Sequence, residues 1–220
     1  MNRVTRFYRT AIGKKVVMAV TGLIGIGFVL GHMAGNLLAF AGAEELNAYA
    51  HFLQSTGELL WILRFTLIAA VVLHIVAAVQ LTIQNRAARP DGYAKREPQV
   101  STWAARTMRW GGVLLVLFIV LHILHFTTGD WKPSGSFVKE DVYGNIVASF
   151  RIWWVTLFYV ISMIALGLHL YHGAWSSVRS LGLSQPSGNP LQRTVAFGVA
   201  LILWLGFTAV PVAVFVGLIG

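Results

Sequence analysis

The chain contains no cysteine, and this absence excludes several classes of protein. Without thiols it forms no disulfide, attaches no c-type haem and ligates no iron–sulfur cluster of its own. Charged residues are also scarce: they make up 11% of the 220 residues, whereas 56% are hydrophobic. A water-soluble domain carries roughly 25% charged residues. We therefore expect an integral membrane protein, for which lipid is the solvent.

The few charges that are present give a formal net charge of +9. In a soluble protein this excess would suggest a nucleic-acid partner. Here the charges lie almost entirely between long apolar runs, so we interpret them as determinants of membrane topology and expect no nucleic acid. The segment 1–15 is basic, but no small-residue cleavage site follows the first apolar run. This run therefore predicts a retained helix rather than a signal peptide.

A helix that crosses a bilayer needs ~20 mostly apolar residues. Five segments meet this requirement, and we expect an all-α protein with a single integral membrane domain over residues 1–220. The first loop contains NAYAHFLQ, which predicts a short helix at the membrane surface. The predicted spans are 16–40, 61–84, 110–127, 152–176 and 194–218.

The distribution of positive charge predicts the orientation of these spans, since cytoplasmic loops carry an excess of lysine and arginine. The N-terminal arm, the second loop and the fourth loop are basic, whereas the first loop carries three glutamates and the third is balanced. We therefore expect the N-terminus in the cytoplasm and the C-terminus outside. The basic residues that decide this are Arg3, Arg6, Arg9, Lys14, Lys15, Arg86, Arg89, Lys95, Arg96, Arg106, Arg109, Arg179 and Arg193.

Histidine is the chemically informative residue of the predicted spans. A polar side chain in hydrocarbon is costly unless it is paired or coordinated. Neutral imidazole is an axial ligand for haem iron, and histidines on facing helices of a bundle form haem sites. The alternative from another class is a haem-free transporter or structural subunit, in which the histidines form proton relays or interhelical hydrogen bonds. Six of the seven histidines fall within spans, namely His32, His74, His122, His125, His169 and His172, and His51 lies in the first loop.

The depth of each histidine follows from the rise of ~1.5 Å per residue in an α-helix. Histidines of the first and third spans fall in the outer half of the membrane, and those of the second and fourth spans fall towards the inner half. Two stacked bis-histidine haems, held by a bundle of these four helices, are the simplest arrangement. Glycines such as Gly25, seven residues before His32, would leave room for a flat porphyrin, although ordinary small-residue helix packing explains them equally well.

Several sequence pieces, taken in order, carry a resemblance to a known family. The chain is similar to the cytochrome b membrane subunits of succinate dehydrogenases and fumarate reductases, in the branch with one five-helix chain and two haems. The resemblance extends over nearly the whole chain except the fifth span and the third loop. The pieces are IGKKVVMAVTGL, GHMAGNL, NAYAHFL, RWGGVLLVLFIVLHILHF and HLYHGAWSSVRSLG.

This resemblance implies one axial haem ligand on each of the first four helices. His32 and His74 match directly. On the third helix the ligand is thirteen residues after the arginine that opens the span, which gives His122 after Arg109. On the fourth it begins the pattern H-x-x-x-G-x-[WY], which gives His169. The implied pairs are His32–His122 for the outer haem b and His74–His169 for the inner one.

Two neighbouring histidines stay open as alternatives, since His125 and His172 each lie three residues beyond a matched position. His51 resembles a family position at the outer surface, near a haem propionate or a proton path, and an ordinary surface histidine is an equal interpretation.

The resemblance also implies partners and a role. A flavoprotein subunit and an iron–sulfur subunit would bind at the cytoplasmic face of a bacterial plasma membrane, and a quinone, often menaquinone, would react within the membrane. This chain would be the non-flavin membrane subunit, without succinate chemistry of its own. We expect the quinone near the inner helix ends, around residues 9–14. The alternative is a dihaem cytochrome b of another quinone-linked dehydrogenase or of a hydrogenase.

Overall fold

The computed structural model describes residues 2–88, 103–184 and 190–220. Every regular element within these ranges is a helix, which confirms the predicted all-α class. The elements are α1 (Arg3–Arg9), α2 (Ala11–Asn36), η1 (Leu37–Phe40), α3 (Ala43–Ser55), α4 (Glu58–Ala87), α5 (Trp103–Ile123), η2 (Leu124–Thr128), α6 (Val142–Phe150), α7 (Trp153–Ser180) and α8 (Pro190–Phe215).

Five of these helices are long and apolar enough to cross a membrane, which confirms the predicted number of spans. They are α2 with η1, α4, α5 with η2, α7 and α8. The third is helical from Trp103, the first described residue after residue 88, and so includes seven residues before the predicted start at residue 110. Polar residues such as Arg106 are tolerated at the end of a long helix, because the apolar core of the bilayer covers only part of it.

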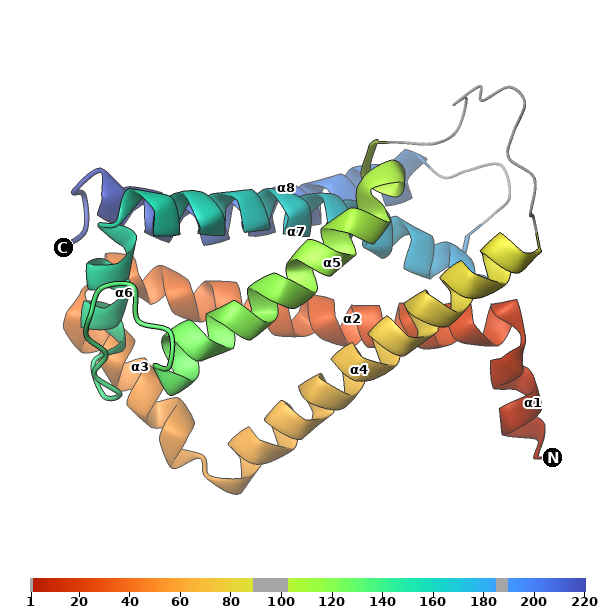
Figure 1. Ribbon diagram of the computed structural model, residues 1–220, viewed down its shortest axis with the longest axis horizontal. Coiled ribbons are helices and arrows are strands. Elements are labelled where there is room, and N and C mark those ends of the chain that lie inside the picture. The colour runs from red at the N-terminus through yellow and green to blue at the C-terminus, as the bar shows by residue number, and fades with distance from the viewer. Residues whose placement is uncertain (1, 89–102, 185–189) are drawn as a thin grey trace.

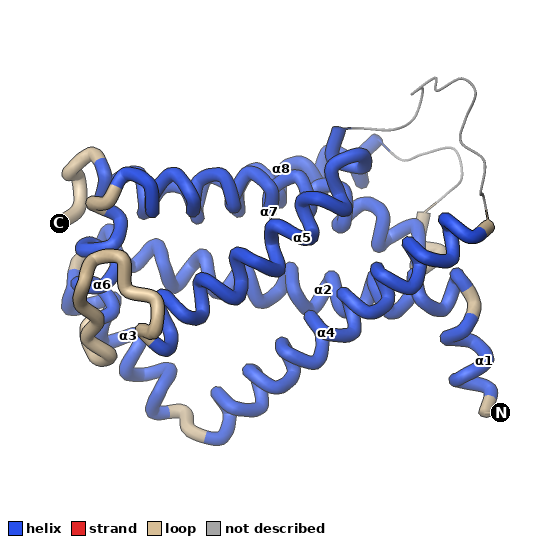
Figure 2. The backbone as a smooth tube through the Cα atoms, in the orientation of Figure 1, coloured by secondary structure: helices blue, strands red, loops and turns tan. Residues whose placement is uncertain are grey.

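The five long helices run lengthwise through the molecule, with the N-terminus and α1 at one end and α3, α6 and the C-terminus at the other (Figure 1). Helix α7 packs against α8, α5 and α2, and α2 also packs against α4. Helix α4 diverges from the other helices towards the end that carries α3, as the backbone tube also shows (Figure 2). An odd number of spans places the two termini on opposite sides of a membrane, whichever side each one faces.

A sharp elbow joins α1 to α2. The hydroxyl of Thr10 accepts a hydrogen bond from Gly13 N at 2.9 Å and caps α2. The ammonium of Lys14, with 4% of its surface exposed, donates to the carbonyl oxygens of Tyr8 and Arg9 at 3.2 and 2.9 Å. These carbonyls lie at the C-terminus of α1, where a helix leaves its acceptors free and a cation is favourable.

The opposite end of the bundle is closed by α3 and α6. The predicted helix over NAYAHFLQ is present as part of α3. Helix α6 lies in the third loop, for which we predicted no helix. Asp141 caps α6 by accepting a hydrogen bond from Gly144 N at 2.9 Å. Apolar side chains of α6, Ile146 and Phe150 among them, enter a buried cluster with α7 and α8. Arg89, Lys95 and Arg96 of the second loop, which contribute to the predicted orientation, lie outside the described residues.

Candidate cofactor-binding site

The first candidate pair joins α2 to α5. The ring centroids of His32 and His122 lie 5.8 Å apart with an interplanar angle of 80°. The His32 ring stacks on Phe28 at 5.3 Å and contacts Phe207 of α8 at 5.9 Å, whereas Phe118 stacks on His122 at 5.5 Å. Aromatic side chains thus pack against both imidazoles, and His32 keeps an exposed surface.

The second pair joins α4 to α7. The ring centroids of His74 and His169 lie 6.1 Å apart with an interplanar angle of 57°. His32 and His122 lie near the C-terminal ends of α2 and α5, whereas His74 and His169 lie in the interior of α4 and α7. The structure therefore pairs the four histidines that the resemblance implies as ligands, in two layers along the bundle.

The spacing within each pair fits a shared metal ion. Imidazole nitrogens bind transition metals at ~2 Å, so two imidazoles on opposite sides of one ion place their ring centroids about 6 Å apart. Among the described residues no three His, Cys, Asp or Glu side chains are grouped as a metal site. A bare zinc ion takes three or four protein ligands, whereas iron in a porphyrin already has four nitrogens and needs two. Two isolated pairs therefore fit haem better than free metal.

A threonine on α2 orients the His74 ring. The Thr21 hydroxyl lies 3.1 Å from Nδ1 of His74 and donates its own proton to the carbonyl oxygen of Val17 at 2.7 Å. Because this proton is already used, Thr21 accepts from Nδ1–H of His74, and Nε2 is left with its lone pair. A metal-bound histidine characteristically donates its second N–H in this way.

A tyrosine on α7 contacts both histidines of the third span. The Tyr159 hydroxyl lies 3.3 Å from Nδ1 of His122 and 3.0 Å from Nδ1 of His125. The second nitrogen of His125 lies 2.9 Å from the Ser149 hydroxyl. His125 thus has protein partners at both ring nitrogens, while His122 has one and keeps Nε2 for another ligand. This arrangement favours His122 over His125 as the metal ligand.

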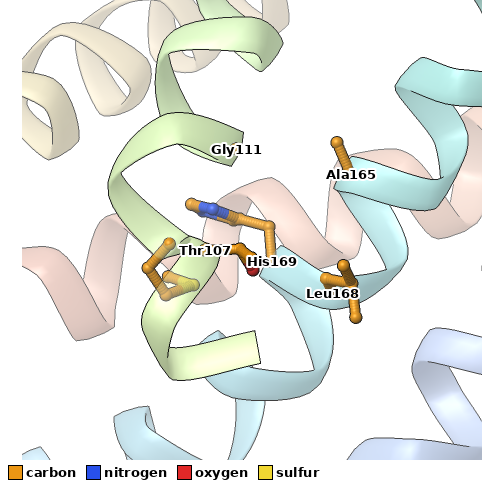
Figure 3. A pocket seen from close by; sticks show the side chains of 6 residues that line it. Thr107, Gly111, Ala165, Leu168 and His169 are labelled. Atoms are coloured by element: carbon orange, nitrogen blue, oxygen red, sulfur yellow. The ribbon is translucent and has the colours of Figure 1, made fainter. Parts of the chain in front are cut away.

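On α7 the two histidines also differ in their surroundings. His169 extends from α7 towards α5 and lines a small pocket between these helices (Figure 3). The ring of His172 instead lies against Trp175 at 5.3 Å in an edge-on arrangement. The pocket is lined by Thr107, Met108, Gly111, Ala165, Leu168 and His169.

Small residues leave space beside the imidazoles. A Cβ atom added at Gly22 would lie 3.5 Å from Cε1 of His74, in ordinary van der Waals contact with the ring. Gly25, on the same face of α2 as His32, and Gly111, beside His169, have no described neighbour within 4 Å of such an atom. A wide, flat group such as a porphyrin needs this lack of bulk, so the residues present fit haem.

The remaining expectations concern the ends of the bundle. His51 is exposed on α3 and lies outside both layers. The segment expected near the quinone, residues 9–14, forms the elbow between α1 and α2, and Lys14 is used there to cap α1.

Thr21, Tyr159 and Ser149 were missed in the sequence analysis, although each contacts a histidine. The sequence does give a weak signal for Tyr159. Tyrosine in a membrane helix is enriched at the interfaces, so a tyrosine within the fourth predicted span suggests a polar contact inside the bundle. The contacts of Thr21 and Ser149 join residues 53 and 24 positions apart, a pairing that periodicity cannot reveal.

Comparison with known proteins supports the resemblance that the motifs indicate. No protein-family model matches the chain. No solved structure matches it either. The chain is 24% identical over 195 residues to the succinate dehydrogenase cytochrome b558 subunit of Bacillus subtilis (strain 168), an alignment that covers 87% of this chain and 89% of the relative.

Five helices of the described residues are long and apolar enough to cross a membrane, and the relative found is a bacterial cytochrome b558 subunit. This chain is therefore a multi-pass protein of a bacterial plasma membrane that is similar, over nearly its whole length, to a succinate dehydrogenase cytochrome b subunit.

Proposed function

We propose that this chain is the membrane anchor and dihaem cytochrome b subunit of a succinate:quinone oxidoreductase. It would pass electrons between an iron–sulfur subunit and a quinone, which we expect to be menaquinone. The observation that carries the proposal is the meeting of four histidines from four helices as two pairs, with ring centroids 5.8 and 6.1 Å apart. The bacterial relative supports the same role.

His32 and His122 would hold the outer haem, and His74 and His169 the inner one. When bound, each haem iron would take up and release one electron, which is the chemistry that the polypeptide lacks. The chain's own residues orient the imidazoles, through Thr21 for His74 and Tyr159 for His122. Phe28, Phe118 and Phe207 pack against the outer pair, and in the membrane the apolar helices would surround both pairs with hydrocarbon.

The partners would be a flavoprotein and an iron–sulfur subunit at the cytoplasmic face. Helix α1 presents Arg3, Arg6 and Arg9, all exposed, at the end of the molecule that we expect to lie in the cytoplasm. Exposed arginines suit contact with acidic surfaces of a soluble subunit or with anionic lipid headgroups. Succinate itself would react on the flavoprotein.

The decisive experiment is haem stoichiometry in the purified protein, with a reduced-minus-oxidised spectrum. We expect about two haems per wild-type chain, and about one in His74→Ala and in His169→Ala, because each variant removes one of the two histidines that would hold the inner haem. His51→Ala is the matched control, since this exposed histidine lies outside both pairs, and it should keep both haems. Purified wild-type protein without haem would contradict the proposal.

The identity of the complex needs a second measurement. Mild-detergent purification followed by mass spectrometry should recover a flavoprotein and an iron–sulfur protein together with the chain. Recovery of hydrogenase or formate dehydrogenase subunits, with both haems present, would keep the dihaem site and replace the succinate assignment.

A further inference from the structure

Behind the outer histidine pair lies a buried polar chain that the proposed function does not require. It begins at His122, passes through the Tyr159 hydroxyl and the His125 ring, and ends at the Ser149 hydroxyl. We propose that Tyr159, His125 and Ser149 act as positioning residues for His122, and that their hydrogen bonds lower the reduction potential of the outer haem. This inference rests on the proposed function, because it takes His122 as an iron ligand.

The direction of every hydrogen bond in this series of side chains would follow from a single bond between His122 and iron. A neutral His122 that binds iron through Nε2 carries its proton on Nδ1 and can only donate from there. The Tyr159 oxygen, at 3.3 Å, accepts a hydrogen bond from that N–H. The Tyr159 O–H in turn donates a hydrogen bond to Nδ1 of His125 at 3.0 Å. His125 then carries its proton on Nε2 and donates it to the Ser149 oxygen at 2.9 Å.

Burial isolates these three groups from water. Tyr159 is 5% exposed, and His125 and Ser149 are each 2% exposed. Hydrogen bonds at such depth polarise one another, and a missing partner is not replaced by solvent. The three residues come from α7, η2 and α6, so helices at the outer end of the bundle fix the chain from three sides. Segment η2 is a π-helix, a rare conformation that is frequent at functional sites.

Such a chain changes the electronic character of the ligand. An acceptor at Nδ1–H makes the imidazole a stronger donor to the metal. A stronger donor favours the oxidised over the reduced iron and so lowers the potential. The acceptor for His74 differs. The Thr21 hydroxyl donates its hydrogen bond to the carbonyl oxygen of Val17 on its own helix, so the series of hydrogen bonds ends there. The two layers therefore have unequal hydrogen-bonding partners behind their ligands.

The test is a redox titration of Tyr159→Phe in the purified full-length chain with its associated subunits. Phenylalanine keeps the ring and removes only the oxygen, so both haems should stay bound. We expect the equilibrium constant for reduction of the outer haem to rise roughly tenfold, which is about 59 mV for a one-electron couple. The inner haem should be unchanged. The reduction step that disappears from the titration of His122→Ala identifies the outer haem.

Two further variants make the result specific. Ser149→Ala removes the last acceptor and should raise the same potential by less, because the bond at His122 itself survives. Ser162→Ala is the matched control: Ser162 is fully buried on α7, and its hydroxyl bonds only the carbonyl oxygen of Phe158 at 2.8 Å. It should leave both potentials unchanged.

The outcomes separate this inference from the proposed function. Two bound haems with an unchanged outer potential in Tyr159→Phe would overturn the inference and leave the proposed function intact. An equal shift in Ser162→Ala would also overturn it, since the effect would then be general to α7. If Tyr159→Phe loses the outer haem, the test rests on Ser149→Ala. An unchanged potential of the outer haem in Ser149→Ala would then overturn the inference. A wild-type protein without haem would instead overturn the proposed function.

Discussion

At the scale of single residues, the partners of the ring nitrogens distinguish histidines that the sequence leaves equivalent. His122 and His125 are three positions apart on one helical segment, and both contact Tyr159. Only His125 also has a partner at Nε2, the Ser149 hydroxyl, so its lone pairs and protons are fully used within the protein. A residue satisfied in this way has a structural or tuning role, whereas His122 keeps one nitrogen for a ligand.

This difference predicts opposite outcomes for two substitutions. His122→Ala should lose one haem of two, because an axial ligand disappears. His125→Leu should retain both haems and unfold at a lower temperature, since it leaves two buried hydroxyls with lost partners, each worth about 1–3 kcal/mol. Haem content per chain and thermal unfolding in detergent measure the two effects. Retention of both haems in His122→Ala together with loss of one in His125→Leu would assign the ligand to His125.

At the scale of elements, α3 and α6 close the end of the bundle that carries the C-terminus (Figure 1), through a few polar contacts. The Asn47 amide donates to Oδ1 of Asp141 at 3.0 Å, and its oxygen accepts from Tyr143 N at 3.0 Å. The two helices lie in different loops, so Asn47 joins segments that are far apart in the sequence. Asn145 fixes the loop before α6 by two hydrogen bonds to the main chain of Val138.

We therefore expect Asn47→Ala to destabilise this end without removing either haem. The substitution leaves the Tyr143 amide without its partner, and such a loss costs about 1–3 kcal/mol. Thermal unfolding, and limited proteolysis of the loops that contain α3 and α6, should show the change. Haem content is the second readout. Gln54→Ala, at an exposed position of the same helix, is the control and should have little effect. Equal stability of the two variants would show that the Asn47 link contributes nothing.

At the scale of the whole molecule, five spans place the two termini on opposite sides of the membrane, and the positive charge predicts which side each one takes. The exposed arginines of α1 should face the cytoplasm, where they are attracted to anionic lipid headgroups. Leu218, 80% exposed beyond the end of α8, should face the outside.

The absence of cysteine allows a direct test of this orientation. A single cysteine introduced as Thr5→Cys should react with a membrane-impermeant maleimide only after cells are permeabilised. The same residue introduced as Leu218→Cys should react in intact cells. The wild-type chain is the unlabelled control. The reverse pattern of labelling would invert the predicted topology and move the expected docking face to the other side.

The sequence alone determined the helical class and the five spans, because apolar length and the scarcity of charge are local properties that lipid imposes on any chain. The depth of the histidines along these spans also predicted two layers, and the structure places His32 beside His122 and His74 beside His169. Local patterns missed α6, whose apolar face becomes buried only when α7 and α8 are present.

Only the tertiary structure decided which polar groups meet. Thr21 with His74, Tyr159 with His122 and His125, and His125 with Ser149 are contacts between different helices. Each depends on how helices rotate and cross in the packed bundle, and a one-dimensional pattern carries no record of those angles. The chain of hydrogen bonds behind the outer pair therefore exists only once α5, α6 and α7 have packed.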